Sequence, residues 1–368
     1  MPTTVKRLAF VDALKAIASQ LIVLHHLAFY GPMSTVANDL APEFFSWLSH
    51  NARVAVQVFL VIGGFLAAKA LAPTGHLMER SPLALIRKRY FKLVLPYAAA
   101  VLLSILCAAI ARILMDDDSI PDPPTGWQLF AHLTLLQGVL NFDSLSAGVW
   151  YIAIDFQLFS LFLLMLWLAR GVGRGNIYTL TAAVALVTAL ALASLFAFNR
   201  DADWDNWALY FFAAYALGVL AYWATRSEEK TDWLLVMASV VGVALIVDFR
   251  SRIAVALLTA LALGAAQRWH LIESFPRNAL LAYLGKISYS VFLVHFSVIL
   301  LVNAVFSRIA ADNPAANALG IVLAWGASTA VGALFYRLVE SRAGGWPAST
   351  RAALTHLRER WLAAGGKP

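Results

Sequence analysis

The chain has 368 residues, of which 61% are hydrophobic and 13% charged, and its formal net charge is +7. A soluble domain needs more charged surface, so this composition excludes that class and indicates a polytopic membrane protein. The single cysteine, Cys107, excludes a disulfide within the chain and a cysteine-rich metal site, and we expect no bound metal.

Ten apolar runs recur along the chain, each near the roughly 20 residues that a bilayer requires. They cover residues 12–30, 51–71, 93–114, 149–169, 177–198, 206–223, 233–248, 252–268, 283–304 and 317–338. Backbone groups in lipid must be satisfied within the segment, and no alternating pattern indicates a barrel. We therefore predict an all-α fold with about ten transmembrane helices, of which the seventh and eighth are short.

Basic residues gather in alternate loops, counted from the amino terminus. Those loops contain Lys6, Arg7, Lys69, Arg80, Arg87, Lys88, Arg89, Lys92, Arg170, Arg174, Arg226, Lys230, Arg268, Arg277 and Lys286. The loops on the other side hold few arginines and more acidic residues. This positive-inside bias predicts that both termini are cytoplasmic. It also explains the net charge as a topology signal, so we expect no nucleic-acid partner.

Two regions lie outside the apolar runs. Residues 115–148 begin with an acidic, proline-rich stretch and become amphipathic from Trp127 to Leu140, which predicts a surface segment, a re-entrant segment or a lid. Residues 343–368 alternate apolar residues such as Leu354 and Trp361 with arginines, which is typical of a basic amphipathic helix on the cytoplasmic leaflet. We therefore divide the chain into a membrane domain, 1–342, and a cytoplasmic tail, 343–368.

The first apolar run carries ionisable residues on one helical face. A rotation of about 100° per residue places Asp12, Lys15, Ser19, Ile22 and His26 in one stripe. Ionisable groups in hydrocarbon are expensive and usually face a bundle interior or an aqueous cavity. Lys15 and His26 are separated by about 16 Å along the helix axis, so they lie at different depths.

His26 is the strongest candidate for a catalytic base, because a neutral imidazole can accept a proton from a hydroxyl near neutral pH. A histidine in a membrane helix can also simply bond to a neighbouring helix. The lysine and aspartate on the same stripe favour a functional role. His25 points away from the stripe and is interpreted as a packing residue.

A basic cluster, Arg87, Arg89 and Lys92, precedes Pro96 at the expected entrance to the third run. Such a cluster fits a lipid-headgroup anchor and a site for nucleotide phosphates equally well. Asp155 is expected about two turns inside the fourth run, behind Trp150, at a depth similar to that of His26. A buried aspartate must be paired, protonated or in contact with water, so Asp155 could orient His26.

Two further runs contain polar or small residues. Ser288 and His295 are seven positions apart and share a helix face, which fits a packing network or a functional role. In the second run, the paired glycines Gly63 and Gly64 permit close helix approach, or passage of a narrow ligand close to the backbone.

Together these segments resemble the membrane-bound acyltransferase-3 family, which is widespread in bacteria. The similarity extends from Arg7 to Glu340, and its most specific element is a basic residue, ten intervening positions and a histidine, matched by Lys15 and His26. The other segments are residues 57–66, 89–96, 150–159, 284–295 and 336–340. Three positions depart from the family pattern, since Lys15 replaces Arg, Gly63 replaces Ser and Asp155 replaces Glu.

The resemblance implies a multi-pass protein of the bacterial inner membrane whose domain 1–342 transfers an acyl group. The donor would be acyl-CoA, most often acetyl-CoA, and the acceptor a hydroxyl of a cell-surface glycan or lipid-linked sugar, with membrane lipid as a further partner. The sequence leaves the oligomeric state open. A transporter or flippase that uses the same His and Asp as a proton relay is the alternative, and a receptor without activity is a third.

On this basis we expect the following roles. His26 is the base or is transiently acylated, Asp155 holds its tautomer, and Tyr289 or Ser288 stabilises the oxyanion. The CoA phosphates lie near Lys15, Arg87, Arg89 and Lys92. The candidate substrate-binding residues are Asp12, Gln57, Trp150, Tyr151 and His295. A water-accessible tunnel should connect the basic cluster with His26.

Overall fold

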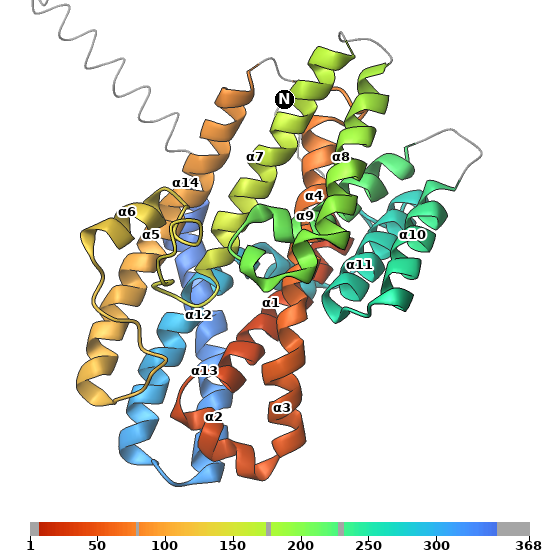
Figure 1. The fold of residues 1–368 in the computed structure, drawn as a ribbon. Coiled ribbons are helices and arrows are strands. Elements are labelled where there is room, and N and C mark those ends of the chain that lie inside the picture. Colours follow the sequence, from red (N-terminus) through yellow and green to blue (C-terminus); the bar gives the residue numbers. More distant parts are fainter. Residues whose placement is uncertain (1–6, 79–80, 174–177, 227–231, 344–368) are drawn as a thin grey trace, which may run out of the picture.

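The computed structural model describes residues 7–78, 81–173, 178–226 and 232–343. Helices account for the regular structure within these ranges, which contain no strand (Figure 1). The all-α prediction is therefore confirmed. The predicted tail, 343–368, lies outside the described residues apart from Ala343.

Seven helices in the described ranges are long and apolar enough to cross a membrane. They comprise α1 (Ala9–Phe29), the continuous stretch of α3 (Pro42–Asn51), η2 (Ala52–Ala55) and α4 (Val56–Leu71), α5 (Pro82–Leu114), α7 (Val149–Val172), α8 (Tyr178–Phe196) extended by η3 (Phe198–Arg200), α12 (Ala279–Ile309), and α13 (Pro314–Phe335) extended by η5 (Tyr336–Glu340) and α14 (Ser341–Ala343). The molecule is therefore a multi-pass membrane protein.

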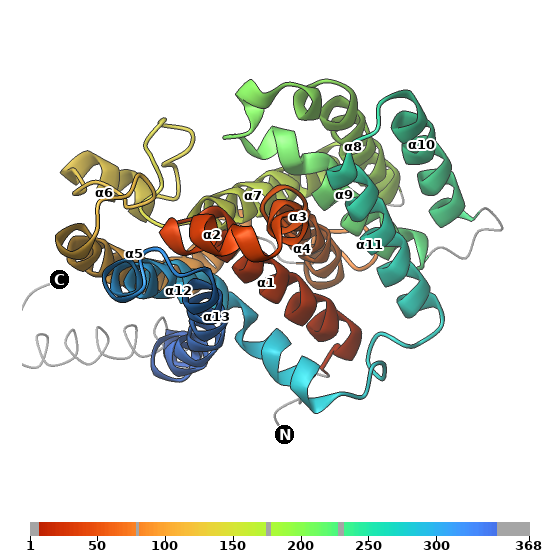
Figure 2. The ribbon, with the colours of Figure 1, turned by 90° about the horizontal axis from the view of Figure 1, so that it is seen from below.

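Three shorter helices correspond to the remaining apolar runs: α9 (Ala208–Ala224), α10 (Trp233–Val247) and α11 (Ser251–Arg268). Every predicted run thus contains a helix, while the number of ten spans stays a prediction. In both ribbon views α10 and α11 lie at the periphery, away from α5, α12 and α13 (Figures 1 and 2). The connections contain α2 (Pro32–Ala37), η1 (Asn38–Leu40), α6 (Gly126–Leu133) and η4 (Ala202–Trp204).

The third run begins earlier than the sequence predicted. Helix α5 starts at Pro82 rather than at residue 93, because Ser81 caps it by accepting a hydrogen bond from the Ala84 amide at 3.4 Å and Pro82 suits the first turn. Consequently Arg87, Arg89 and Lys92 lie on the helix itself, with Arg89 and Lys92 on one face and Arg87 on another.

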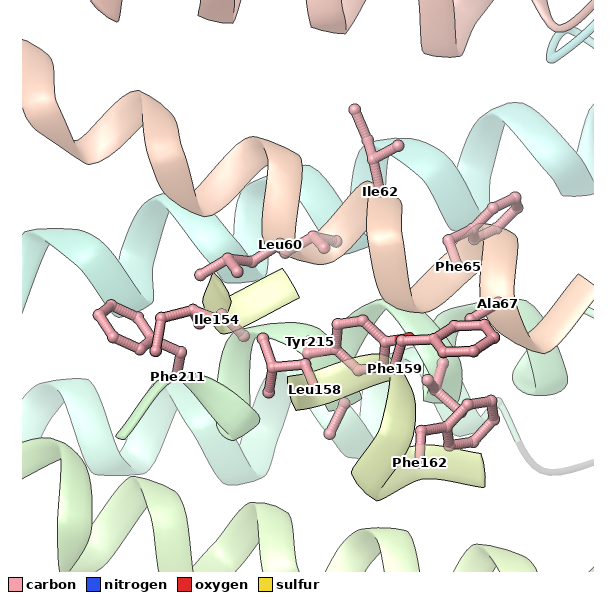
Figure 3. Packing of buried hydrophobic residues seen from close by; sticks show 14 of the residues in the cluster. Leu60, Ile62, Phe65, Ala67, Ile154, Leu158, Phe159, Phe162, Phe211 and Tyr215 are labelled. Atoms are coloured by element: carbon pink, nitrogen blue, oxygen red, sulfur yellow. The ribbon is translucent and has the colours of Figure 1, made fainter. Parts of the chain in front are cut away.

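Glycines bring the central helices into close contact. A Cβ at Gly64 of α4 would lie 1.9 Å from the Tyr215 carbonyl oxygen of α9, and one at Gly285 of α12 would lie 2.1 Å from that of Asp12 on α1. Only glycine permits such approaches. Figure 3 shows the resulting apolar packing between α4, α7 and α9, where Phe65, Leu158 and Tyr215 interdigitate.

The segment between α5 and α7 folds back onto the bundle. Helix α6 begins with a capping box formed by Thr125 and Gln128 and is bonded to α5 through the Tyr90 hydroxyl, which donates to the Leu133 carbonyl at 2.8 Å. Beyond α6, Leu135 and Gln137 are 0% exposed. Part of the stretch that the sequence predicted as a surface segment, a re-entrant segment or a lid is therefore buried in protein.

Candidate functional site

Helices α1 and α12 bring two imidazoles together. Nδ1 of His26 lies 2.6 Å from Nε2 of His295, and the rings are nearly parallel, with centroids 4.9 Å apart. Both side chains are buried. We call these two residues the imidazole pair. His25 points elsewhere, and its Nδ1 lies 3.0 Å from the Leu48 carbonyl oxygen of α3, in agreement with a supporting role.

The hydrogen-bond network fixes the tautomers of the neutral imidazole pair. Nδ1 of His295 lies 3.2 Å from the Val291 carbonyl oxygen, which can only accept, so this nitrogen carries the proton. Nε2 of His295 is then an acceptor, and Nδ1 of His26 must donate to it. Nε2 of His26 therefore carries a lone pair, and it has no hydrogen-bond partner among the described residues.

Asp155 does not contact His26 as the sequence predicted. Its carboxylate forms an ion pair with Arg89 of α5, and it lies against Gly63, where an added Cβ would be 3.3 Å from the carboxylate oxygen. The Asp155 side chain is 8% exposed and that of Arg89 is 30% exposed. Helical spacing did not give the direction of the Asp155 side chain, and α5 supplies a guanidinium on the face to which it points. The partner that orients His26 is His295.

Five charged side chains from four segments converge around this ion pair: Lys15 of α1, Arg89 and Lys92 of α5, Asp155 of α7 and Glu340 of η5. Lys15 interacts electrostatically with Lys92, Arg89 and Glu340, and Lys92 also with Asp155. We call these five residues the ionic cluster. It contains three cations and two carboxylates. Asp12, the charged group that interacts most strongly with Lys15, is itself paired with Arg7, so one positive charge of the cluster is still left without a counterpart.

The cations of the ionic cluster are not equally satisfied. Arg89 is paired, whereas neither Lys15 nor Lys92 forms a hydrogen bond or ion pair with any residue that the structure describes. Glu340 accepts a hydrogen bond from the Ser290 hydroxyl at 2.6 Å. Two ammonium groups that repel each other and lack bonded partners suit an anionic ligand.

Arg87 does not join the other predicted donor-binding cations. It is exposed and lines a cavity of about 560 Å³ on another face of α5, together with Tyr90, Thr134 and Phe156. The basic residues predicted to act together therefore lie in two places: Arg89 and Lys92 belong to the ionic cluster, and Arg87 lies outside it.

Three further predicted site residues have their hydrogen-bonding groups engaged. The Ser288 hydroxyl donates to the Gly285 carbonyl at 3.0 Å, and the Tyr289 hydroxyl donates to the Leu93 carbonyl at 3.1 Å. Neither has a proton free for an oxyanion, so this geometry does not support the expected role. Asp12 accepts from Nε of Arg7 at 2.5 Å, which makes it a partner of Arg7 rather than a free substrate ligand.

Two of the remaining candidates, Tyr151 and Trp150, are connected to the imidazole pair through Phe292. Tyr151 packs edge-on against Phe292, with centroids 5.4 Å apart, and Phe292 lies 6.0 Å from His295. Trp150 stands beside Tyr151 at 6.4 Å. Gln57 of α4 is buried and has no hydrogen bond with any described residue. The imidazole pair lines neither the cavity beside Arg87 nor the one between Gln137 and Trp150.

Sequence reasoning missed two participants. Glu340 was recognised as part of a family-like segment but not as a site residue, although an acidic residue at the end of an apolar run was a usable signal. Gln137 lies in the α6–α7 connection and is 0% exposed, although a glutamine in an amphipathic stretch is ordinarily expected on the polar face. The first could have been found from the sequence, and the second could not.

A family model described as an acyltransferase domain matches residues 8–337. No curated protein and no solved structure matches the chain. The match includes the imidazole pair and every member of the ionic cluster except Glu340. The chain belongs to the acyltransferase-3 family and is a membrane acyltransferase.

Proposed function

We propose that the protein transfers an acetyl group from acetyl-CoA to a hydroxyl of a cell-surface glycan or lipid-linked sugar, in the bacterial inner membrane, with both termini cytoplasmic. The observation that carries the proposal is the imidazole pair, in which His295 holds the proton on Nδ1 of His26 and leaves Nε2 with a lone pair. An oriented neutral imidazole is suited to general-base catalysis near neutral pH.

The ionic cluster is the proposed site of the CoA phosphates. Lys15 and Lys92 have no bonded partners in the described chain, and the cluster carries one excess positive charge. Lys15 and His26 lie on the same helix, about 16 Å apart along its axis, which is comparable with an extended pantetheine arm. A donor bound through its phosphates therefore has the length to present its thioester to His26.

The chemical step uses His26 twice. Nε2 accepts the proton of the acceptor hydroxyl while the oxygen attacks the thioester carbonyl carbon. The tetrahedral intermediate then collapses, the C–S bond breaks, and the departing thiolate takes the proton back from Nε2. Because His26 is 7% exposed and His295 is 0% exposed, both substrates reach the pair only if neighbouring side chains move.

The proposal is tested with labelled acetyl-CoA and membranes that contain the protein. Label should appear in envelope glycan with the wild type and disappear with His26→Ala, while folding and membrane insertion are retained. The alternative, a transporter or flippase with a proton relay, requires no acetyl-CoA. The transporter would be favoured by export of unacetylated glycan from the membrane. That export should require His26 and should proceed without acetyl-CoA.

A further inference from the structure

A second, polar cavity lies apart from the ionic cluster. It has a volume of about 370 Å³ and is enclosed by residues 137–144, the first turns of α7 and residues 205–211 at the start of α9. Loops and helix ends from three parts of the chain therefore build it. None of the roles assigned above explains why these segments converge there.

The wall of this cavity is rich in side-chain amides. Gln137, Asn141, Gln157 and Asn206 all contribute to it. Gln137 is 0% exposed, and neither its amide nitrogen nor its amide oxygen has a hydrogen-bond partner in the described structure. Burying an amide without partners destabilises a protein, so such a group calls for a specific explanation. Both amide atoms are closed to solvent, so a ligand with donors and acceptors supplies the missing partners once the neighbouring wall residues shift.

Aromatic rings form the apolar part of the wall. Trp150 of α7 and Phe211 of α9 lie with centroids 5.6 Å apart and a tilt of 32°. Trp150 is half-buried, so part of its face remains open. An apolar ring face beside several amides suits a ligand with one face of C–H groups and hydroxyls around its edge.

The charge of the cavity is negative. Asp143 and Asp205 are exposed at its rim, and no lysine, arginine or histidine lines it. Arg252, which does not line the cavity, interacts electrostatically with Asp205 and lies 5.0 Å from the centroid of the Tyr210 ring. Two carboxylates repel an anionic ligand and accept hydrogen bonds from hydroxyls or an ammonium group.

The cavity is connected to the imidazole pair by a series of aromatic contacts. Trp150 contacts Tyr151, Tyr151 contacts Phe292, and Phe292 contacts His295. A ligand of several linked units could therefore be anchored in the cavity while another unit lies nearer to His26.

We propose that this cavity binds a carbohydrate that is uncharged or carries amino groups, and that it excludes carbohydrates rich in carboxylates or phosphates. That the carbohydrate is the acyl acceptor rests on the proposed function, whereas the binding and its charge preference do not. If the carbohydrate is the acceptor, the negative charge of the cavity restricts it to glycans without many carboxylates or phosphates.

Binding is measured without any acyl donor, on the whole protein in lipid nanodiscs, by saturation-transfer NMR. The probes are chitotriose, which is neutral, the trimer of glucosamine, which is cationic, and trigalacturonate, which is anionic. Chitotriose and the glucosamine trimer should bind, and trigalacturonate should not. Trp150→Ala should weaken chitotriose binding about tenfold, as expected for loss of one ring contact worth about 1.4 kcal/mol.

Removal of the rim charges tests the electrostatic part. The double variant Asp143→Asn and Asp205→Asn should acquire binding of trigalacturonate. The matched control, Asp39→Asn with Asp203→Asn, removes the same charge from exposed positions that do not line the cavity. The control should exclude trigalacturonate as the wild type does. Equal gain in both variants would attribute the effect to net charge and overturn the proposed site.

Gln137→Met separates ligand binding from stability. Methionine is apolar and similar in length, so it removes the unpartnered amide and should raise Tm. It should also lower chitotriose affinity by about tenfold, because one hydrogen-bonding group of the site is lost. A higher Tm with unchanged affinity would contradict a role for Gln137 in binding.

The two proposals can fail separately. Wild-type protein that binds trigalacturonate as well as chitotriose, or that binds neither neutral nor cationic trimer, overturns the carbohydrate site. Protein that shows the expected binding but transfers no acetyl group retains the site and contradicts the proposed function.

Discussion

The imidazole pair is buried in the helix bundle, whereas the ionic cluster extends from the buried Asp155 to the exposed Lys92, and the two groups are stabilised in different ways. The imidazole pair has two neutral rings that satisfy each other through one hydrogen bond and one backbone carbonyl. The ionic cluster consists of full charges of which only Arg89 and Asp155 form an ion pair. Both groups include a residue of α1, so one helix connects them.

This difference indicates a division of tasks. A group that must gain and lose a proton has to be neutral at rest, and a second imidazole orients it without charging it. A group that binds a polyanion has to keep unpaired positive charge, which Lys15 and Lys92 supply. If the two regions have these tasks, substitutions in one should change catalytic turnover and substitutions in the other should change donor binding or stability.

The largest expected effect is the loss of the base. His26→Ala should lower kcat by about 10³-fold, within the range found for positioned acid–base groups, while the KM for acetyl-CoA changes little. Initial rates of acetyl transfer in proteoliposomes measure both constants. The neighbouring variant His25→Gln is the control and should remain within about threefold of the wild type, since His25 bonds only to the Leu48 carbonyl among the described residues. Full activity of His26→Ala would contradict the assignment of proton transfer to the imidazole pair and of donor binding to the ionic cluster.

The next effect concerns stability. Arg89→Gln leaves the Asp155 carboxylate buried without its partner and should destabilise the fold by about 3–5 kcal/mol. The double variant with Asp155→Asn removes both charges and should recover much of this loss. The free energies of unfolding of the wild type, the single variant and the double variant, measured in mixed detergent micelles, check this order. Equal stability of Arg89→Gln and the wild type would show that the ion pair is not structural.

His295 tests how the imidazole pair is oriented. His295→Ala should reduce kcat by about 10- to 100-fold, as for other residues that orient a reactive group. His295→Gln places an acceptor near the former Nε2 and should restore part of the activity. If the glutamine variant is as slow as the alanine variant although both fold, the tautomer argument is wrong.

Lys92 tests the donor side. Lys92→Gln should raise the KM for acetyl-CoA about tenfold and leave kcat nearly unchanged, because it removes one charge contact. The exposed Arg87 lines a cavity on another face of α5 and provides the matched control, and Arg87→Gln should leave KM unaltered. A similar increase in KM in both variants would show that the ionic cluster attracts the donor only through the overall positive charge of the surface.

The smallest expected effect is a pH dependence of the local stability of α6, which is not one of the membrane-spanning helices. Burial lowers the pKa of the His132 imidazole of α6 below its ordinary value of 6.5. Its Nδ1 donates to Gln128 and its Nε2 accepts from Leu145, so only the neutral ring fits. When the pH falls below 6.5, the opened segment binds more protons than the folded one, and stability declines. Hydrogen exchange of residues 126–148 should therefore quicken in acid, and His132→Asn should abolish that acceleration.

Much of the fold could be predicted from the sequence, because apolar runs of fixed length leave little choice in a bilayer. The stripe on α1 correctly placed Lys15 and His26 on one helix. The start of α5 was wrong because the basic residues were read as a loop, although Pro82 and Ser81 signalled a helix start.

The site was less predictable than the fold. Helical spacing gives the depth of a residue but not its neighbours on other helices, and so Asp155 was assigned to His26 rather than to Arg89. The pairing of His26 with His295 depends on the contact between α1 and α12, which Gly285 permits. Nothing in the local sequence specifies that contact.

The most direct test is a structure of the protein with bound CoA. The account predicts the CoA phosphates at Lys15 and Lys92, with the thiol in hydrogen-bond reach of Nε2 of His26. Phosphates bound instead at Arg87, in the cavity on the other face of α5, with the imidazole pair still sealed from the ligand, would contradict it.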